Sequence, residues 1–214
     1  MNTPITRILI VDDHAIVRRG LKNILSEQPD MTIVGEAGNY DELMKIVSAT
    51  ECDIVILDVS LPGKNGFDIL KDLRVQYPKL PVLFLSMLPE EQFAARAMKS
   101  GAAGYLSKGS PTEELVKAIR KIIAGKKYVS QEFAEKLAMG FSSNNQKLSH
   151  ELLSEREFQV LLKVASGKSL SDIAAELFLS VKTVATHRSR ILAKMNMHSN
   201  AELVRYAVEH KLIE

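Results

Sequence analysis

The segment Asp53-Ile-Val-Ile-Leu-Asp58-Val-Ser-Leu-Pro62-Gly-Lys-Asn-Gly66 passes from a short apolar run to a carboxylate and then to a loop with proline and glycine. Such a run, rich in isoleucine and valine, predicts a strand buried on both faces, which is typical of a parallel sheet. In open α/β sheets, chemistry gathers outside the carboxyl ends of the strands. Asp58 is predicted to lie at such an end, although an aspartate that only caps the next element would give the same pattern.

A second apolar run, Arg7-Ile-Leu-Ile-Val11, also ends in carboxylates, those of Asp12 and Asp13. If the two strands are neighbours, three carboxylates meet, and their repulsion raises their pKa values unless a cation is bound. We expect oxygen ligands only, with no histidine or cysteine among them, and this set favours Mg2+. Asp13 has an alternative role as the N-cap of a helix beginning near Ala15.

The composition is that of a soluble globular protein, with 46% apolar and 25% charged residues among 214. That length allows two ordinary domains. No apolar run is long enough to span a membrane and no signal-peptide pattern is present, so we expect a cytoplasmic protein without a membrane partner. A single cysteine, Cys52, agrees with a reducing compartment. Because the net charge is only +2, any nucleic-acid binding must come from local clustering of charge.

Strands and helices alternate over residues 1–125, which predicts an α/β fold with a five-stranded parallel, doubly wound (flavodoxin-like) sheet. Ser110-Pro-Thr-Glu113 is interpreted as a capping box for the last helix of this domain. The expected strands lie near 7–11, 31–36, 53–57, 81–85 and 103–106. The expected helices lie near 15–27, 40–49, 66–76, 90–100 and 111–124.

Residues 126–147 are interpreted as a linker, within which 130–139 could form a helix. No strand pattern follows, so 148–214 is predicted to be a small all-α domain. A capping box at Ser154-Glu-Arg-Glu157 opens its first helix. A short helix, a tight turn at 178–180 and a longer helix from Val181 to Met195 then form a helix-turn-helix arrangement.

Three more residues are expected at the edge of the sheet that holds the carboxylates. Ser86 ends the fourth strand, Tyr105 lies in the fifth, and Lys108 follows it. Each alone has an ordinary explanation, as a cap, a packing residue or a surface charge. Together, a lysine ammonium facing carboxylates and a metal ion implies a bound anion, for which a phosphoryl group is the natural candidate.

With Asp12, Asp13 and Asp58, these residues resemble the receiver domain of bacterial response regulators over roughly residues 6–125. The resemblance implies that Asp58 is the phosphoacceptor. It also implies that Mg2+ is held by Asp13, Asp58 and the backbone carbonyl of Ser60, with Asp12 acting through water.

The same resemblance implies that Lys108 pairs with the phosphoryl group, that Ser86 moves to hydrogen-bond it, and that Tyr105 changes rotamer as a switch residue. Two positions depart from the family pattern. Asn65 stands where the family often has aspartate, and Gly109 stands where many receivers have a cis proline.

The helix expected from Val181 to Met195 carries four cations, and no acidic residue occurs from Leu177 to Ala201. At about 100° per residue, Val184, Ile191 and Met195 share the core face. Arg188 falls near that face and is interpreted as a packing residue. A polar front with a cationic flank is typical of a helix that lies in the DNA major groove. The expected DNA-binding residues are Lys182, Thr183, Thr186, His187, Ser189, Arg190 and Lys194.

The second domain resembles the LuxR-type helix-turn-helix, and the whole chain resembles the NarL/FixJ response regulators. This implies a sensor histidine kinase and double-stranded promoter DNA as partners, and a homodimer in the active state. Ala185 stands where many members have lysine, so no base preference is carried over. On the last helix, Leu203, Ala207 and Val208 share a face that serves either as a dimer contact or as core.

The predicted function is a DNA-binding transcription regulator, not an enzyme, that is switched by phosphorylation of Asp58. One alternative is a regulator that acts without phosphorylation. Another is an aspartyl-nucleophile phosphatase, which the serine at position 60 disfavours because such enzymes typically place a second acid there. An adaptor acting only through protein contacts leaves the cationic flank unexplained.

Overall fold

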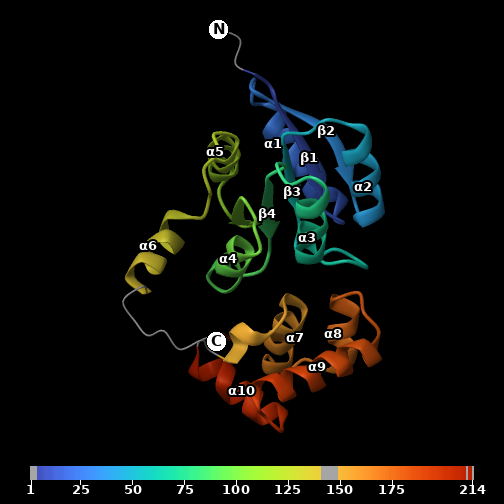
Figure 1. Cartoon of the computed structure of the whole chain (residues 1–214), viewed down its shortest axis with the longest axis vertical. Helices are drawn as coiled ribbons and strands as arrows, with labels where there is room; N and C mark the ends of the chain where they lie inside the picture. Colours follow the sequence, from blue (N-terminus) through green and yellow to red (C-terminus); the bar gives the residue numbers. More distant parts are fainter. Residues whose placement is uncertain (1–3, 141–148, 211, 214) are drawn as a thin grey trace. The chain divides into compact units, whose positions relative to one another are not determined.

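The computed structural model describes residues 4–140, 149–210 and 212–213. The chain divides into two compact units, residues 1–141 and 142–214 (Figure 1), and each is described by itself. The first unit contains every strand of the described chain. Its strands are β1 (Thr6–Val11), β2 (Met31–Ala37), β3 (Ile54–Leu57), β4 (Val82–Ser86) and β5 (Gly104–Ser107). Its helices are α1 (Ala15–Ser26), α2 (Tyr40–Ala49), α3 (Gly66–Gln76), α4 (Glu90–Lys99), α5 (Thr112–Ile123) and α6 (Gln131–Gly140).

The five strands form one parallel sheet in the order β2-β1-β3-β4-β5, which is the flavodoxin-like order. The expected α/β fold is therefore confirmed, and the bounds of α1 to α5 and of all five strands agree with the expected ones to within a single residue. Because β1 and β3 pair directly, Val11 lies opposite Leu57. The residues that follow these two strands therefore emerge side by side.

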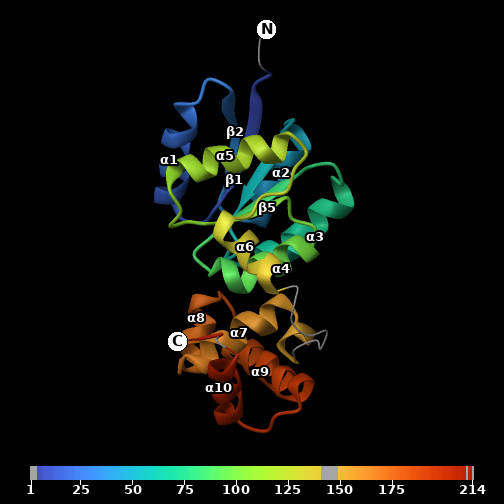
Figure 2. The ribbon, with the colours of Figure 1, turned by 90° about the vertical axis from the view of Figure 1, so that its left-hand side faces the viewer.

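Helices cover both faces of the sheet (Figures 1 and 2). Apolar residues of α1 and α5 pack on one face against β1, β3 and β4, and Figure 2 shows these two helices lying in front of the sheet. Figure 1 shows α2 and α3 on the other side. β3 is buried along its whole length, as a strand covered on both faces must be.

The expected capping box at the start of α5 is wrong. The N-cap residue is Pro111, which has no side-chain donor or acceptor, and no side chain bonds to the first turn. Ser110 instead belongs to a turn, in which its backbone N–H donates to Ser107 at 3.0 Å. Glu113 and Glu114 in the first turn still interact favourably with the helix dipole.

The segment after α5 packs with the first unit. Tyr128 is only 2% exposed, lies in the core cluster with α5, and forms a bridge with Gly104 of β5. The expected linker of 126–147 thus begins with residues that belong to the core of the first unit, followed by α6, whose start the sequence suggested. The tether expected around 140–147 lies largely outside the described residues, so this boundary stays a prediction.

Within its described residues, the second unit has helices as its only regular secondary structure, as expected. It contains the 3-10 turn η1 (Ser149–Leu152) and helices α7 (Glu155–Ala165), α8 (Leu170–Glu176), α9 (Val181–Met195) and α10 (Asn200–Glu209). The capping box of Ser154 and Glu157 opens α7, which confirms that prediction. Within the described residues, no helix has the length and apolarity needed to span a membrane.

Candidate functional site

Backbone hydrogen bonds hold three charged residues at the carboxyl edge of the sheet. The N–H of Asp58 donates to Val11 O at 2.8 Å, which fixes the end of β3 beside the end of β1. The N–H of Lys108 donates to Ser86 O at 2.8 Å, and that of Asp12 to Ala37 O at 3.0 Å. The sheet register therefore brings together side chains that lie 46 or more residues apart, as the sequence predicted for neighbouring strands.

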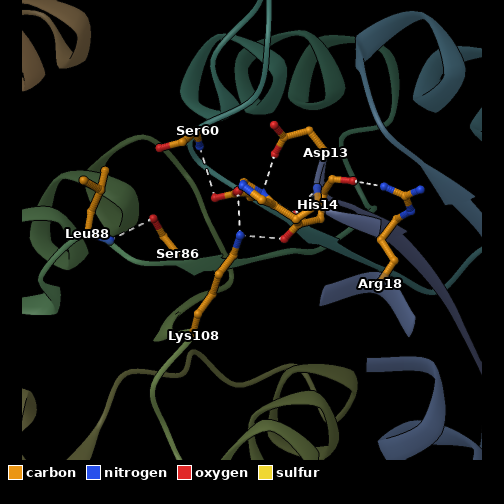
Figure 3. Close-up of polar contacts among 9 residues, drawn as sticks. Asp13, His14, Arg18, Ser60, Ser86, Leu88 and Lys108 are labelled. Carbon is orange, nitrogen blue, oxygen red and sulfur yellow. Dashed lines mark hydrogen bonds and ion pairs between the residues drawn. The ribbon is translucent and has the colours of Figure 1, made fainter. Parts of the chain in front are cut away.

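The ammonium of Lys108 lies between two buried carboxylates (Figure 3). Its Nζ is 2.6 Å from Asp12 Oδ2 and 2.7 Å from Asp58 Oδ2. The carboxylate side chains are each 3% exposed, and that of Lys108 is 9% exposed. Interactions between charges are strong where water is excluded, so the lysine is held by both aspartates.

The protonation of this cluster follows from its burial and its neighbours. Burial raises the pKa of Asp58 above its ordinary value, and the hydrogen bond from Lys108 only partly opposes this. For Lys108, burial lowers the pKa, but the bonds to Asp12 and Asp58 outweigh it and leave the pKa raised. The ammonium is therefore charged at neutral pH and available to a further anion.

The loop after β3 is built around Asp58. The N–H of Ser60 donates to Asp58 Oδ1 at 3.1 Å. A Cβ on Gly66 would lie 2.5 Å from the carbonyl oxygen of Asp58, so only glycine allows α3 to begin this close to the loop. The buried Asn65 caps α3 by accepting from the N–H of Asp68 at 3.0 Å, which explains how an asparagine serves at this position.

Ser86 and Tyr105 lie on β4 and β5, next to Lys108, and both are fully buried. The hydroxyl of Ser86 accepts from the N–H of Leu88 at 3.2 Å (Figure 3). The hydroxyl of Tyr105 donates to the carbonyl of the same leucine at 2.8 Å. Burial raises the pKa of Tyr105, and a hydrogen bond with Ser86 opposes this only in part. Both side chains thus contact the segment between β4 and α4.

Asp13 faces the same site, but it is not the N-cap of α1. The N-cap is His14, whose side chain makes no capping bond. The Oδ1 of Asp13 is buried and accepts no hydrogen bond of acceptable geometry, although the ring Nδ1 of His14 lies 2.8 Å away. An unsatisfied buried carboxylate oxygen beside two other carboxylates fits a site for a hard divalent cation.

The expectation that no histidine lies among the potential ligands is wrong. Ligand atoms of Asp12, Asp13, His14 and Asp58 all lie within 4.8 Å of one another. His14 was not predicted as a ligand, although it directly follows the two aspartates and that adjacency was the available signal. Arg18 was missed too; its guanidinium donates to the carbonyl of Asp12 at 2.6 Å.

In the second unit, α9 has the expected faces. Val184 and Ile191 are fully buried and Met195 is 6% exposed. Lys182 and Arg190 are exposed, and neither has a carboxylate partner among the described residues. Arg188 is half-buried, and its Nε donates to Asn200 Oδ1 at 2.6 Å, which agrees with a packing role.

Other polar residues of α9 bond within the helix. Thr183 is half-buried, and its Oγ1 lies 2.8 Å from the hydroxyl of the N-cap Ser180. The exposed hydroxyls of Thr186 and Ser189 donate to backbone carbonyls one turn earlier, so their oxygens can still accept from solvent or a ligand. The predicted polar front is therefore present on the surface.

Lys194 departs from the expected arrangement. The interpretation of four cations without counter-charge is wrong at this position, because Nζ of Lys194 lies 2.6 Å from Oε2 of Glu157 on α7. Burial would raise the pKa of Glu157, but the bonds from Lys194 and Ser154 outweigh it and lower the pKa. His187, on the same flank, is half-buried, and burial with the nearby Arg156 lowers its pKa.

Comparison with known proteins covers both units. The model of the response regulator receiver domain matches residues 8–120, more than half of the chain, and that of the bacterial regulatory proteins of the luxR family matches residues 151–207. Response regulator GacA of Pseudomonas aeruginosa is 35% identical over 209 residues, covering 97% of this chain and 98% of GacA. The chain belongs to the NarL/FixJ family of response regulators.

Other relatives of this response regulator agree. Oxygen regulatory protein NreC of Staphylococcus epidermidis is 38% identical, covering 97% of this chain and 99% of NreC. A crystal structure of a LuxR-family two-component response regulator from Aurantimonas covers 65% of this chain with 34% identity and a TM-score of 0.61. RcsB of Salmonella typhimurium, with 23% identity and a TM-score of 0.69, shows the same fold.

The response regulator thus joins a receiver to a LuxR-type helix-turn-helix. It is a DNA-binding regulator of transcription in a two-component system, in which a histidine kinase is the upstream partner and promoter DNA the target.

Proposed function

We propose that Asp58 accepts a phosphoryl group from a histidine kinase, and that this switches DNA binding by α9. The observation that carries the proposal is the buried contact of the Asp58 carboxylate with Lys108, at the edge of the sheet where β1, β3, β4 and β5 all end. A carboxylate oxygen of Asp58 forms the new bond to phosphorus as the bond between phosphorus and the kinase histidine nitrogen breaks.

Lys108 pairs with the transferred group and neutralises part of the negative charge on its oxygens. Asp13, Asp58 and the backbone carbonyl of Ser60 would hold Mg2+, with Asp12 acting through water, and the bound ion would supply further neutralisation of phosphoryl charge. The unsatisfied Oδ1 of Asp13 supports this assignment.

The acyl phosphate adds nearly two negative charges to a site that is otherwise buried. Ser86 and Tyr105 are proposed to respond, because both bond to Leu88 in the segment that leads into α4. A movement of that segment changes the surface of the receiver without any change in the core of the sheet.

On the DNA side, we propose that Thr186 and Ser189 of α9 face base edges, while Lys182 and Arg190 contact phosphates. Thr183, His187 and Lys194 line the same flank, but they are partly engaged within the unit. The active form in this proposal is a cytoplasmic homodimer on two half-sites.

The last helix contributes mainly to the core of its own unit. Leu203 and Ala207 are fully buried, whereas Val208 is 53% exposed. The expectation that all three share one face is therefore wrong, and of the three only Val208 is available to a second copy.

The test is labelling of the full chain by a small phosphodonor in the presence of Mg2+. Wild type is expected to be labelled and Asp58→Asn to be unlabelled. Asp53→Asn is the matched control, because Asp53 precedes the same strand at its other end and pairs with Arg7. Persistent labelling of Asp58→Asn would refute the assignment. DNA affinity unchanged by labelling would instead support a regulator that acts without phosphorylation.

A further inference from the structure

His14 lies beside Asp13 (Figure 3), and its ring nitrogen is also close to the carboxylate of Asp12. Its backbone N–H donates to Asp12 Oδ1 at 2.9 Å, which turns the start of α1 toward the carboxylates. The ring Nδ1 then lies 3.2 Å from Asp12 Oδ1 and 2.8 Å from Asp13 Oδ1. One ring nitrogen is therefore in contact range of both carboxylates.

These two distances match the spacing of ligands around a metal ion. Neighbouring ligands of an octahedral ion at about 2.1 Å are separated by about 3.0 Å, and opposite ligands by about 4.2 Å. The two distances from His14 Nδ1, 2.8 and 3.2 Å, lie on either side of the separation of neighbouring ligands. The ligand atoms of all four residues lie within 4.8 Å of one another, close to the separation of opposite ligands. Only a small closure is needed for a common ion.

A single proton on Nδ1 does not satisfy both carboxylates. The Oδ1 of Asp13 accepts no hydrogen bond of acceptable geometry, even with the ring nitrogen 2.8 Å away. A divalent cation in place of that proton would contact the nitrogen and Asp13 Oδ1 directly, with Asp12 Oδ1 reached through water. The imidazole makes no capping bond to α1, its side chain is 60% exposed, and its ring nitrogen contacts the carboxylates of Asp12 and Asp13.

We propose that Nδ1 of His14 is a ligand of the divalent cation at the receiver site, and that it shifts the preference of the site from Mg2+ toward borderline ions such as Ni2+ and Zn2+. Imidazole nitrogen suits these ions, whereas Mg2+ takes oxygen ligands. The inference rests on the proposal that the acidic cluster binds a divalent cation, and it adds a residue that sets which cation.

The experiment is calorimetric titration of the metal-stripped full chain with Ni2+ and, separately, with Mg2+. In His14→Ala, the Ni2+ affinity is expected to fall by at least about tenfold, since even the loss of groups that merely support a ligand typically costs that much. The Mg2+ affinity is expected to stay within about threefold, because Mg2+ does not depend on a nitrogen ligand. His198→Ala is the matched control, an exposed histidine in the second unit.

A second readout detects the bond itself. Pulsed electron paramagnetic resonance of the Mn2+-loaded protein, with 15N-labelled histidine, is expected to show nitrogen coupling in wild type and none in His14→Ala. Equal Ni2+ affinity in wild type and His14→Ala, or nitrogen coupling that persists in the variant, would overturn the proposal.

The outcomes separate this inference from the proposed function. If Asp58 is not labelled by a phosphodonor but the Ni2+ affinity still depends on His14, the phosphoacceptor assignment fails and the ligand assignment stands. If Asp58 is labelled and Ni2+ binds His14→Ala as tightly as wild type, the reverse holds.

Discussion

Replacing Lys108 by methionine tests the charge arrangement on which the receiver site depends. Methionine keeps an unbranched apolar stem and removes only the ammonium, which lies 2.6 and 2.7 Å from the carboxylates of Asp12 and Asp58. In metal-free protein, the variant would leave two carboxylates, each 3% exposed, facing one another without a cation.

Removal of one partner from a buried ion pair costs about 3–5 kcal/mol. The Lys108 side chain is only 9% exposed, so solvent screening reduces this little. Because burial already raises the pKa of Asp58, protonation of that carboxyl relieves part of the cost, and we expect about 3 kcal/mol. If the free energy of unfolding falls by about 2 kcal/mol per molar urea, the urea concentration at the unfolding midpoint of the receiver should fall by about 1.5 M.

The assay is urea unfolding in EDTA, followed by circular dichroism and by hydrogen exchange of receiver amides, because the chain has two units and no tryptophan. Addition of Mg2+ should recover part of the loss, since the ion replaces the missing positive charge. The double variant Asp58→Asn/Lys108→Met should be more stable than Lys108→Met alone. Lys45→Met, which alters an exposed lysine on α2, is the control.

An unchanged midpoint for Lys108→Met in EDTA would refute this reasoning. It would mean that the ammonium does not bridge the two aspartates in solution, and the charged cluster that supports phosphoryl binding would not exist as described.

Three further predictions concern the second unit. The pKa of Glu157 is lower in the folded unit than in the unfolded chain, so its ionised form stabilises the folded unit at pH values above the unfolded pKa of about 4.3. This stabilisation is lost as the pH falls through the folded pKa. Glu157→Gln should therefore weaken the acid sensitivity of this unit in hydrogen exchange, and unaltered sensitivity would contradict the role of the Lys194 pair. Arg190→Ala should weaken DNA binding equally on all sequences and reduce the salt slope by about 1. Lys194→Ala should in addition lower the free energy of unfolding of the second unit by about 1 kcal/mol, a modest loss because Lys194 is partly exposed. For either variant, a loss of DNA binding confined to one operator would argue against phosphate contacts.

The arrangement of the sheet was predictable because its strands are short, mainly apolar runs separated by helical patterns, and every strand except β2 ends in or is followed by a polar residue. The alternation of Ile, Val and Leu runs with amphipathic stretches leaves few ways to bury both faces of β3. Asp58 and Lys108 were predictable as partners for the same reason, since parallel strands deliver their ends to one edge.

The start of α5 shows where local patterns mislead. Ser110 and Glu113 have the spacing of a capping box, but Ser107 and Ser110 close a turn that leaves Pro111 as the N-cap. Helix bounds depend on such competition between nearby backbone bonds, and sequence spacing does not reveal which bond forms.

By itself, the sequence determined the α/β receiver, the helical second unit and the residues at the strand ends, because hydrophobic periodicity dictates which faces are buried. Only the tertiary structure decided that His14 faces Asp12 and Asp13, and that Glu157 neutralises Lys194 across two helices. Such contacts join side chains whose directions follow from how elements turn and pack against one another. Periodicity along one element carries no information about the charge that a neighbouring element presents to it.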